Sequence, residues 1–293
     1  MANLKAIRSR IKSVQATQKI TRAMRLVAAA KVRRAQMRVL AARPFTSRVV
    51  RLLREVVRDT APIDLQELPL LHRHEIKKVG IIVLSSDRGL CGSYNTNVFR
   101  VTLERIQALQ AEGKEVALIL VGLKAVAFFR SIKVERLKTY TLLPAIPTVE
   151  EAKLIADQAA ELYVSRKLDS VEIMGTHFLS MLRSEVVNTL FLPVDLPAPE
   201  ERKALQPEML FEPTIQEVME RELLPKYIEN VIYQALLEAS ASELAARMNA
   251  MTNASNNARD LITSLTLVYN KARQASITQE LLEIIGGAEA LRG

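Results

Sequence analysis

The chain has 293 residues, 49% of them hydrophobic, and its 41 Lys and Arg exceed its 32 Asp and Glu for a formal net charge of +9. This length fits one large or two ordinary domains with a buried core. With 4% aromatic residues, no Trp, nine Gly and 11 Pro, the composition excludes a disordered chain and favours packed helices over an all-β sandwich. The single cysteine, Cys91, excludes an internal disulfide framework and a zinc site built on cysteines.

The charge is concentrated at one end of the sequence. Residues 1–60 carry 16 Lys and Arg against two acidic residues, whereas the remaining residues sum to a net charge of −5. A concentrated basic face predicts an acidic partner, which is nucleic acid, lipid or protein. The longest charge-free apolar runs, 79–86 and 116–123, are far shorter than the ~20 residues of a membrane span. The N-terminus lacks the plan of a secretory signal, although its Arg-rich, acid-free character is also that of a mitochondrial transit peptide.

Residues 3–59 are predicted to form a helix that Asn3 caps. Its apolar stripe starts at heptad spacing with Leu4, Ile7, Ile11 and Val14. Gln18, Thr21 and Arg25 interrupt this register, and after a slip the stripe continues at Met24, Ala28, Val32, Ala35, Val39 and Ala42. Pro44 is expected to kink or end the helix.

The middle of the chain alternates between two periodicities. Strands are predicted at 79–84, 116–121 and 171–174, and helices at 95–111, 123–130 and 148–167. The last helix opens with a capping box, because Glu151 follows Thr148 by three residues. This alternation with continuous apolar strands predicts an α/β layer with a mostly parallel sheet. Connecting loops are expected at 60–76 and in the proline-rich stretch 193–213.

A helical pattern returns from 214 to 285, with Pro225 as its only interior breaker. Its 3,4 spacing predicts a left-handed coiled coil through Met251, Ala254, Ala258, Leu261, Leu265, Val268, Ala272, Ala275, Gln279 and Leu282. From 225 to 285 this helix spans about 90 Å at ~1.5 Å per residue, which an α/β domain of ~100 residues cannot cover. We therefore expect a Rossmann-like globular α/β domain at 60–213. The N-terminal helix 1–59 and the C-terminal helix 214–293 would form a long antiparallel two-helix coiled coil.

Residues with catalytic potential are few. His72 and His74 are weak evidence for a metal without further ligands. Residues 85–93 follow a strand and precede a helix, where α/β folds bind ligands, but the GK[ST] ending of a P-loop is missing. Asp87 as a nucleophile is one interpretation, and a tight turn held by Asp87 and two glycines is the favoured one. Cys91 is interpreted as a small buried filler. We assign no catalytic residue, no cofactor and no metal.

Two features of the C-terminal helix indicate a partner. Four asparagines crowd nine residues although Asn is a poor helix former, which predicts a polar surface that hydrogen-bonds a partner: Asn249, Asn253, Asn256 and Asn257. The apolar stretch 281–291 lies beyond the reach of the N-terminal helix, and an exposed apolar helix end in water is an aggregation liability. Another protein should enclose it.

Four segments, 11–31, 86–92, 241–248 and 269–280, resemble in the right order the signatures of the gamma subunit of F-type ATP synthases. The stretch SELAARM and the ending AEALRG are similar to cyanobacterial and chloroplast gamma subunits. Those relatives carry an inserted segment before the C-terminal helix, and chloroplast forms place a redox cysteine pair in it. Residues 192–211 are short and free of cysteine, so the insert is expected to be absent and thiol regulation is not expected.

The resemblance implies a central rotor shaft, present in one copy inside a ring of three alpha and three beta subunits. Its foot would contact the epsilon subunit and the membrane c-ring, with no enzyme activity of its own, no cofactor and no nucleic acid. It would be a peripheral membrane protein that meets the membrane only through the c-ring. Its place would be the cytoplasmic face of a bacterial plasma membrane or the stroma- or cytosol-facing side of a thylakoid membrane.

The resemblance also implies three groups of contact residues. Contacts with the beta subunits fall on Met24, Glu243, Arg247, Arg273, Gln274 and Thr278. Contacts with an apolar sleeve of alpha and beta subunits fall on Leu281, Leu282, Ile284, Ile285 and Leu291. Contacts with the c-ring and epsilon fall on Phe211 and Glu212.

Two other classes of function remain open at this stage. A nucleic-acid-binding protein would use the basic helix to neutralise phosphates, although interleaved aromatics and a recognition motif are lacking. An α/β enzyme would use the Asp87 loop. Neither accounts for a long helix with an apolar end.

Overall fold

The computed structural model describes residues 4–59, 68–142, 144, 146–194 and 214–290. The chain divides into two compact units, and each is described by itself. Unit 1 consists of residues 1–28 and 247–293, and unit 2 consists of residues 29–246. The boundaries fall inside the two long helices, at 28/29 and 246/247, and not at their ends.

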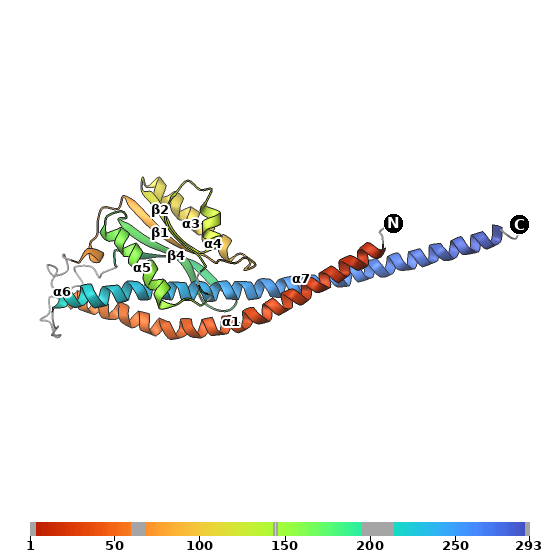
Figure 1. Cartoon of the computed structure of the whole chain (residues 1–293), viewed down its shortest axis with the longest axis horizontal. Helices are drawn as coiled ribbons and strands as arrows, with labels where there is room; N and C mark the ends of the chain where they lie inside the picture. Colours follow the sequence, from red (N-terminus) through yellow and green to blue (C-terminus); the bar gives the residue numbers. More distant parts are fainter. Residues whose placement is uncertain (1–3, 60–67, 143, 145, 195–213, 291–293) are drawn as a thin grey trace. The chain divides into compact units, whose positions relative to one another are not determined.

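The elements are labelled in Figure 1. The helices are α1 (Leu4–Asp59), the short η1 (Pro69–Leu71), α3 (Tyr94–Ala111), α4 (Leu123–Phe129), α5 (Val149–Val164), α6 (Ile215–Val218), the π-helical η3 (Met219–Leu223) and α7 (Leu224–Ala290). The strands are β1 (Lys78–Leu84), β2 (Glu115–Val121), β3 (Glu135–Tyr140), β4 (Ser170–Phe178) and β5 (Ser184–Leu192).

Unit 2 is built on one five-stranded sheet with the strand order β3-β2-β1-β4-β5. The first four strands are parallel, and β5 runs antiparallel to β4 at the edge. In the centre, Ile82 of β1 pairs with Ile119 of β2 on one side and Ile173 of β4 on the other. These strands read as unbroken apolar runs because helices cover both faces of the sheet.

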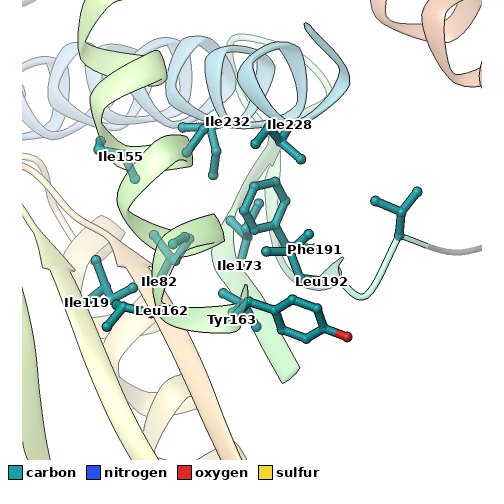
Figure 2. Packing of buried hydrophobic residues seen from close by; sticks show 14 of the residues in the cluster. Ile82, Ile119, Ile155, Leu162, Tyr163, Ile173, Phe191, Leu192, Ile228 and Ile232 are labelled. Carbon is teal, nitrogen blue, oxygen red and sulfur yellow. The ribbon is translucent and has the colours of Figure 1, made fainter. Parts of the chain in front are cut away.

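The two faces of the sheet carry separate hydrophobic clusters. Helices α3 and α4 cover one face through residues such as Phe99 and Phe129. Helix α5 covers the other face together with the part of α7 that contains Ile228 and Ile232 (Figure 2). The unit 2 segments of α1 and α7 are therefore part of the core of the α/β domain.

The predicted strands and helices of this region are all present, and the Rossmann-like α/β class is confirmed. The capping box forms as expected, with Thr148 donating its backbone N–H to Glu151 at 2.7 Å. Strands β3 and β5 were not predicted. Both are edge strands, and most of their side chains are exposed, so neither carries the continuous apolar run that marks a central strand.

Helix α1 extends to Asp59 as predicted, and of the two expected effects of Pro44, an end of the helix does not occur. The predicted slip in its stripe is wrong, since the buried and half-buried positions keep 3,4 spacing through Gln18, Thr21 and Arg25. Thr21 is only 8% exposed, and its hydroxyl donates to the Gln18 carbonyl at 3.1 Å. A polar side chain can hold a seam position when it satisfies its own hydrogen bond locally.

The coiled-coil register predicted for α7 is half right. Met251, Ala258, Leu265 and Ala272 lie on the covered stripe, whereas Leu261 and Val268 are 41% and 49% exposed. The other half of the covered stripe lies one residue after the predicted positions, at Ser255, Ile262, Tyr269 and Ser276. Unit 1 contains only the ends of α1 and α7 (Figure 1), and its buried residues include Thr21 and Ala28 of α1 and Met251 and Ala258 of α7. Residues 214–223 also differ from one regular helix, because α6 and a π-helical turn precede Pro225.

Candidate partner-binding surfaces

The loop after β1 joins the ends of two strands. Ser85 donates its hydroxyl to the Val121 carbonyl and accepts the Ala125 N–H, both at 2.9 Å. The Asp87 carboxylate accepts the Leu123 N–H at 2.8 Å, which satisfies an orphan donor at the start of α4. The Asp87 side chain therefore caps the start of α4, a bond outside its own turn that the sequence analysis did not predict.

The rest of this loop is also held from within. Asn95 donates to the Ser86 hydroxyl at 2.8 Å and to the Cys91 sulfur at 3.3 Å. Cys91 is 2% exposed, so it is the buried filler that the sequence predicts. The polar groups of this loop therefore bond one another, β2 and α4 at the carboxyl edge of the sheet.

The two loop histidines stack on one another. The rings of His72 and His74 lie 5.8 Å apart, nearly parallel, and His74 stacks on Tyr163 at 5.9 Å. Desolvation lowers the pKa of His74, and the nearby Arg166 charge acts in the same direction. No group of three or more potential metal ligands occurs among the described residues.

The polar contact residues predicted near the C-terminus lie on the exposed surface of α7. Arg273, Gln274 and Thr278 are all exposed within unit 1, and the Thr278 hydroxyl donates to the Gln274 carbonyl at 2.9 Å. Gln274 and Thr278 are four residues apart and so share one helix face. The structure thus places Gln274 and Thr278 on one exposed face, and Arg273 is exposed on the same turn as Gln274.

The apolar end of α7 is exposed. Leu281, Leu282, Ile284 and Ile285 are 54%, 65%, 68% and 62% exposed. Ile277, which the sequence reasoning did not single out, is 46% exposed and lies four residues before Leu281, on the same helix face. That i, i+4 spacing is the signal that would have found it. Five large apolar side chains in two turns of helix form a surface that requires a cover.

The remaining predicted contact residues are distributed over both units. Met24 and Arg247 are half-buried in unit 1, and Glu243 is half-buried in unit 2. Phe211, Glu212 and Leu291 lie outside the described residues.

The first 25 described residues of α1 form a cationic surface. Residues 4–28 carry seven Lys and Arg and no acidic residue. Within the described part of the chain, no carboxylate pairs with the exposed Arg8, Arg10, Lys12, Lys19 or Arg22. Such a surface attracts an acidic partner.

These surfaces define the class of protein. A helix pair whose apolar end and cationic face are both uncovered, joined in one chain to a well-packed α/β domain, is a subunit of a larger assembly. In the part of the chain that the structure describes, no helix has the length and apolarity needed to cross a membrane.

A family model described as ATP synthase matches residues 3–291. The chain is 46% identical over 319 aligned positions to the ATP synthase gamma chain of Cyanothece sp. and 47% identical over 318 positions to that of Synechococcus sp.. Each alignment covers all of this chain and all of the relative. The chain therefore belongs to the family of ATP synthase gamma chains. Because 319 aligned positions exceed its 293 residues, the relative carries residues with no counterpart here.

Solved structures with the same fold come from mitochondrial ATP synthases. The chain is similar to one from Tetrahymena thermophila, in a structure of the central stalk and c-ring, with a TM-score of 0.63 and 25% identity over 80% of this chain and 99% of the other. It is also similar to a chain of the Euglena gracilis enzyme, with a TM-score of 0.65 and 21% identity over 98% and 94% of the two chains. The second likeness concerns the fold alone.

Proposed function

We propose that this chain is the central rotor shaft of an ATP synthase and carries torque between a membrane c-ring and catalytic beta subunits. The observation that carries the proposal is a 67-residue helix, α7, that begins in the core of the α/β domain and ends in five exposed apolar side chains. A family of ATP synthase gamma chains supplies the assembly in which such a surface is covered.

The mechanism requires no bond chemistry in this chain. A stiff, asymmetric helix pair presents a different face to each of three surrounding beta subunits, so that each is held in a different conformation. Rotation of the pair then exchanges those conformations, and proton flow through the c-ring is coupled to synthesis or hydrolysis of ATP. Each conformational exchange follows from differential contacts with the rotating surface.

The contact surfaces divide by chemistry. Arg273, Gln274 and Thr278 offer exposed hydrogen-bonding groups to loops of the beta subunits, and Met24, Glu243 and Arg247 would meet their acidic lever. The uncovered cationic surface of α1 supports an acidic partner. Leu281, Leu282, Ile284, Ile285 and Leu291 would turn within an apolar sleeve of alpha and beta subunits.

The other end of the shaft would meet the membrane rotor. Phe211 and Glu212 are proposed to contact the c-ring and the epsilon subunit, so that the chain is peripheral to the membrane. It would be present once for every three alpha and three beta subunits. We propose that its side of the membrane is the cytoplasmic or stromal one.

The test is ATP hydrolysis by purified alpha and beta subunits of a cyanobacterial relative, with and without the full chain. The chain alone is expected to be inactive, and its addition should give a stable complex with sustained, strongly increased turnover. Failure of a soluble, folded chain to join the complex would overturn the proposal. Salt-sensitive retention on DNA would then revive the nucleic-acid alternative, which no relative supports.

Variants of α7 make the test specific. Replacing Arg273, Gln274 and Thr278 together with alanine should lower the turnover of the complex at least tenfold without loss of folding. The control is Arg259→Ala, which removes another exposed arginine of α7. No contact with a beta subunit is assigned to Arg259. Equal turnover in the two variants would contradict the proposed beta-subunit contact.

A further inference from the structure

A single buried carboxylate connects three elements of unit 2. The side chain of Glu238 on α7 is 8% exposed. Its Oε1 accepts from Arg43 Nε of α1 at 3.2 Å and from Gln234 Nε2 at 2.7 Å. Its Oε2 accepts the Phe178 N–H at 3.1 Å, and His177 Nδ1 lies against the same oxygen. The two carboxylate oxygens therefore receive four contacts, from α1, α7 and the end of β4.

Arg43 bonds both Glu238 and the last residue of β4, Phe178. Arg43 Nη2 donates to the Phe178 carbonyl at 2.6 Å, while Arg43 Nε holds the carboxylate. The peptide of Phe178 is thus bound on both sides, through its N–H by Glu238 and through its C=O by Arg43. A planar guanidinium presents donors on different nitrogens in a fixed fork, whereas all three donors of an ammonium radiate from one nitrogen. The sequence offered one signal for this site, a glutamate within the otherwise apolar run Leu236–Ala239.

This arrangement fixes how the two helices sit on the sheet. Apolar helix–sheet contacts tolerate small sliding displacements. A charged hydrogen-bond network around a buried carboxylate does not, because any slip leaves the buried Glu238 carboxylate without its donors. The hydrogen-bond network at Glu238 is therefore suited to hold α1 and α7 in one register against β4.

We propose that Glu238 is a positioning residue that, through Arg43 and Phe178, locks α1 and α7 to the sheet so that torque passes between helices and domain without slip. The inference rests on the rotor function proposed above. The lock lies entirely within unit 2, and both helices continue without a break from it into unit 1.

The molecule contains a matched control. Arg105 of α3 holds Glu172 of β4 through two bonds of 2.9 and 2.5 Å, and Asn188 adds a third contact at 2.6 Å. The side-chain exposures of the two pairs are nearly equal, 35% and 8% for Arg43 and Glu238 against 33% and 9% for Arg105 and Glu172. Among the described residues, the hydrogen bonds of the second pair join α3 to β4 and β5, so its loss tests stability without the lock.

The experiment compares Glu238→Gln with Glu172→Gln in the full chain, assembled with its alpha and beta subunits. The readout is the angular variance of a bead attached to the α/β domain while the complex is stalled and its alpha/beta ring is fixed. Glu238→Gln should raise the variance at least twofold, because the amide presents N–H groups to donors that need an acceptor. Glu172→Gln should leave the variance unchanged at a similar loss of thermal stability.

Two outcomes overturn the proposal, namely an unchanged variance in Glu238→Gln or an equal increase in both variants. If Glu238→Gln does not assemble, Arg43→Lys against Arg105→Lys repeats the comparison with the charges kept. Lysine keeps the charge but lacks the two separate, rigidly spaced nitrogens with which Arg43 bonds Glu238 and the Phe178 carbonyl. An unchanged variance in Arg43→Lys then overturns the proposal as well. Failure of every variant and of the unaltered chain to assemble would count against the rotor function itself.

Discussion

The same two helices have different surroundings in the two units of the chain. In unit 2, Val32 and Val39 of α1 and Ile232 of α7 are fully buried. In unit 1, Ile7 and Ile11 of α1 are only half-buried, and beyond them α7 exposes its apolar end. The apolar spacing of α1 is the same 3,4 pattern in both units.

The difference shows that periodicity sets which face of a helix is apolar, whereas the neighbours set how much of it is covered. In unit 2 the helices pack on a five-stranded sheet and on α5. In unit 1 each helix has only the other, and a two-helix seam covers one narrow stripe. Unit 2 buries an apolar core within the chain, whereas unit 1 leaves much of its apolar surface exposed.

The largest expected effect of a single change is in the shared core of unit 2. Ile232→Ala should lower the free energy of unfolding of this unit by about 2–5 kcal/mol, because it leaves a cavity in a close-packed interior. Hydrogen exchange resolved by peptide measures this loss separately for each unit. Ile262→Ala, at a half-buried position of α7 in unit 1, is the control and should cost less than half as much. Equal losses would mean that the two units do not differ in packing.

Glycine replacements should have opposite signs in the two units. Gly122 has a φ of +96°, and an added Cβ would lie 2.4 Å from the Ser85 carbonyl oxygen. Gly122→Ala should therefore destabilise unit 2 by at least about 1–3 kcal/mol, the usual cost of a strained backbone.

In unit 1, a Cβ at Gly286 meets nothing within 4 Å, so Gly286→Ala should stabilise the end of α7 by about 1 kcal/mol through helix propensity. Circular dichroism and hydrogen exchange measure both changes. A destabilising Gly286→Ala would show that the end of α7 is not a regular solvated helix in the isolated chain.

The register of the seam can be tested with two leucines of α7. Leu265 lies on the covered stripe, and Leu261, which the sequence also placed there, is 41% exposed. Leu265→Ala should lower the stability of unit 1 by about 1–2 kcal/mol and soften the helix pair, since it removes part of a packed side chain. Leu261→Ala should change the isolated chain by less than about 0.5 kcal/mol. If instead Leu261→Ala had the larger effect, the predicted register would be restored.

The smallest effect concerns the alkaline stability of unit 2. Burial raises the pKa of Tyr163 to about 12, and the Asp169 charge acts in the same direction. An unfolded tyrosine titrates near about 10, so the folded state binds this proton more tightly. The resulting stability is fully present below pH 10 and is lost as the pH rises towards 12.

Tyr163→Phe, which also removes the hydrogen bond to the His72 carbonyl, should weaken this dependence. Urea unfolding at pH 8 and pH 11 measures it. Part of the dependence should survive, because burial also raises the pKa of Tyr94 and Tyr140. An unchanged slope between these pH values would show that Tyr163 does not titrate in this window.

The sequence predicted the exposed apolar end of α7, but it gave little signal for the edge strands or for the contacts of Glu238. The exposed apolar end at Leu281–Ile285 followed from its position beyond any partner within the chain. Edge strands β3 and β5 lacked a signal, because most of their side chains are exposed. Glu238 stood out in the sequence only as a charged residue within an apolar run. No nearby residue indicated that Arg43 and Phe178 would be its partners.

The sequence by itself determined the main helices and the central strands β1, β2 and β4, because strand and helix periodicities are local and these strands are continuously apolar. It determined the capping box at Thr148, the turn at Asp87 and the family resemblance in the same local way. Only the tertiary structure decided which of two overlapping apolar stripes of α7 is covered, and that Gln18, Thr21 and Arg25 lie on the seam of α1. It alone brought Arg43, Phe178 and Glu238 together, since contacts between residues 135 and 195 positions apart depend on how whole helices pack on the sheet.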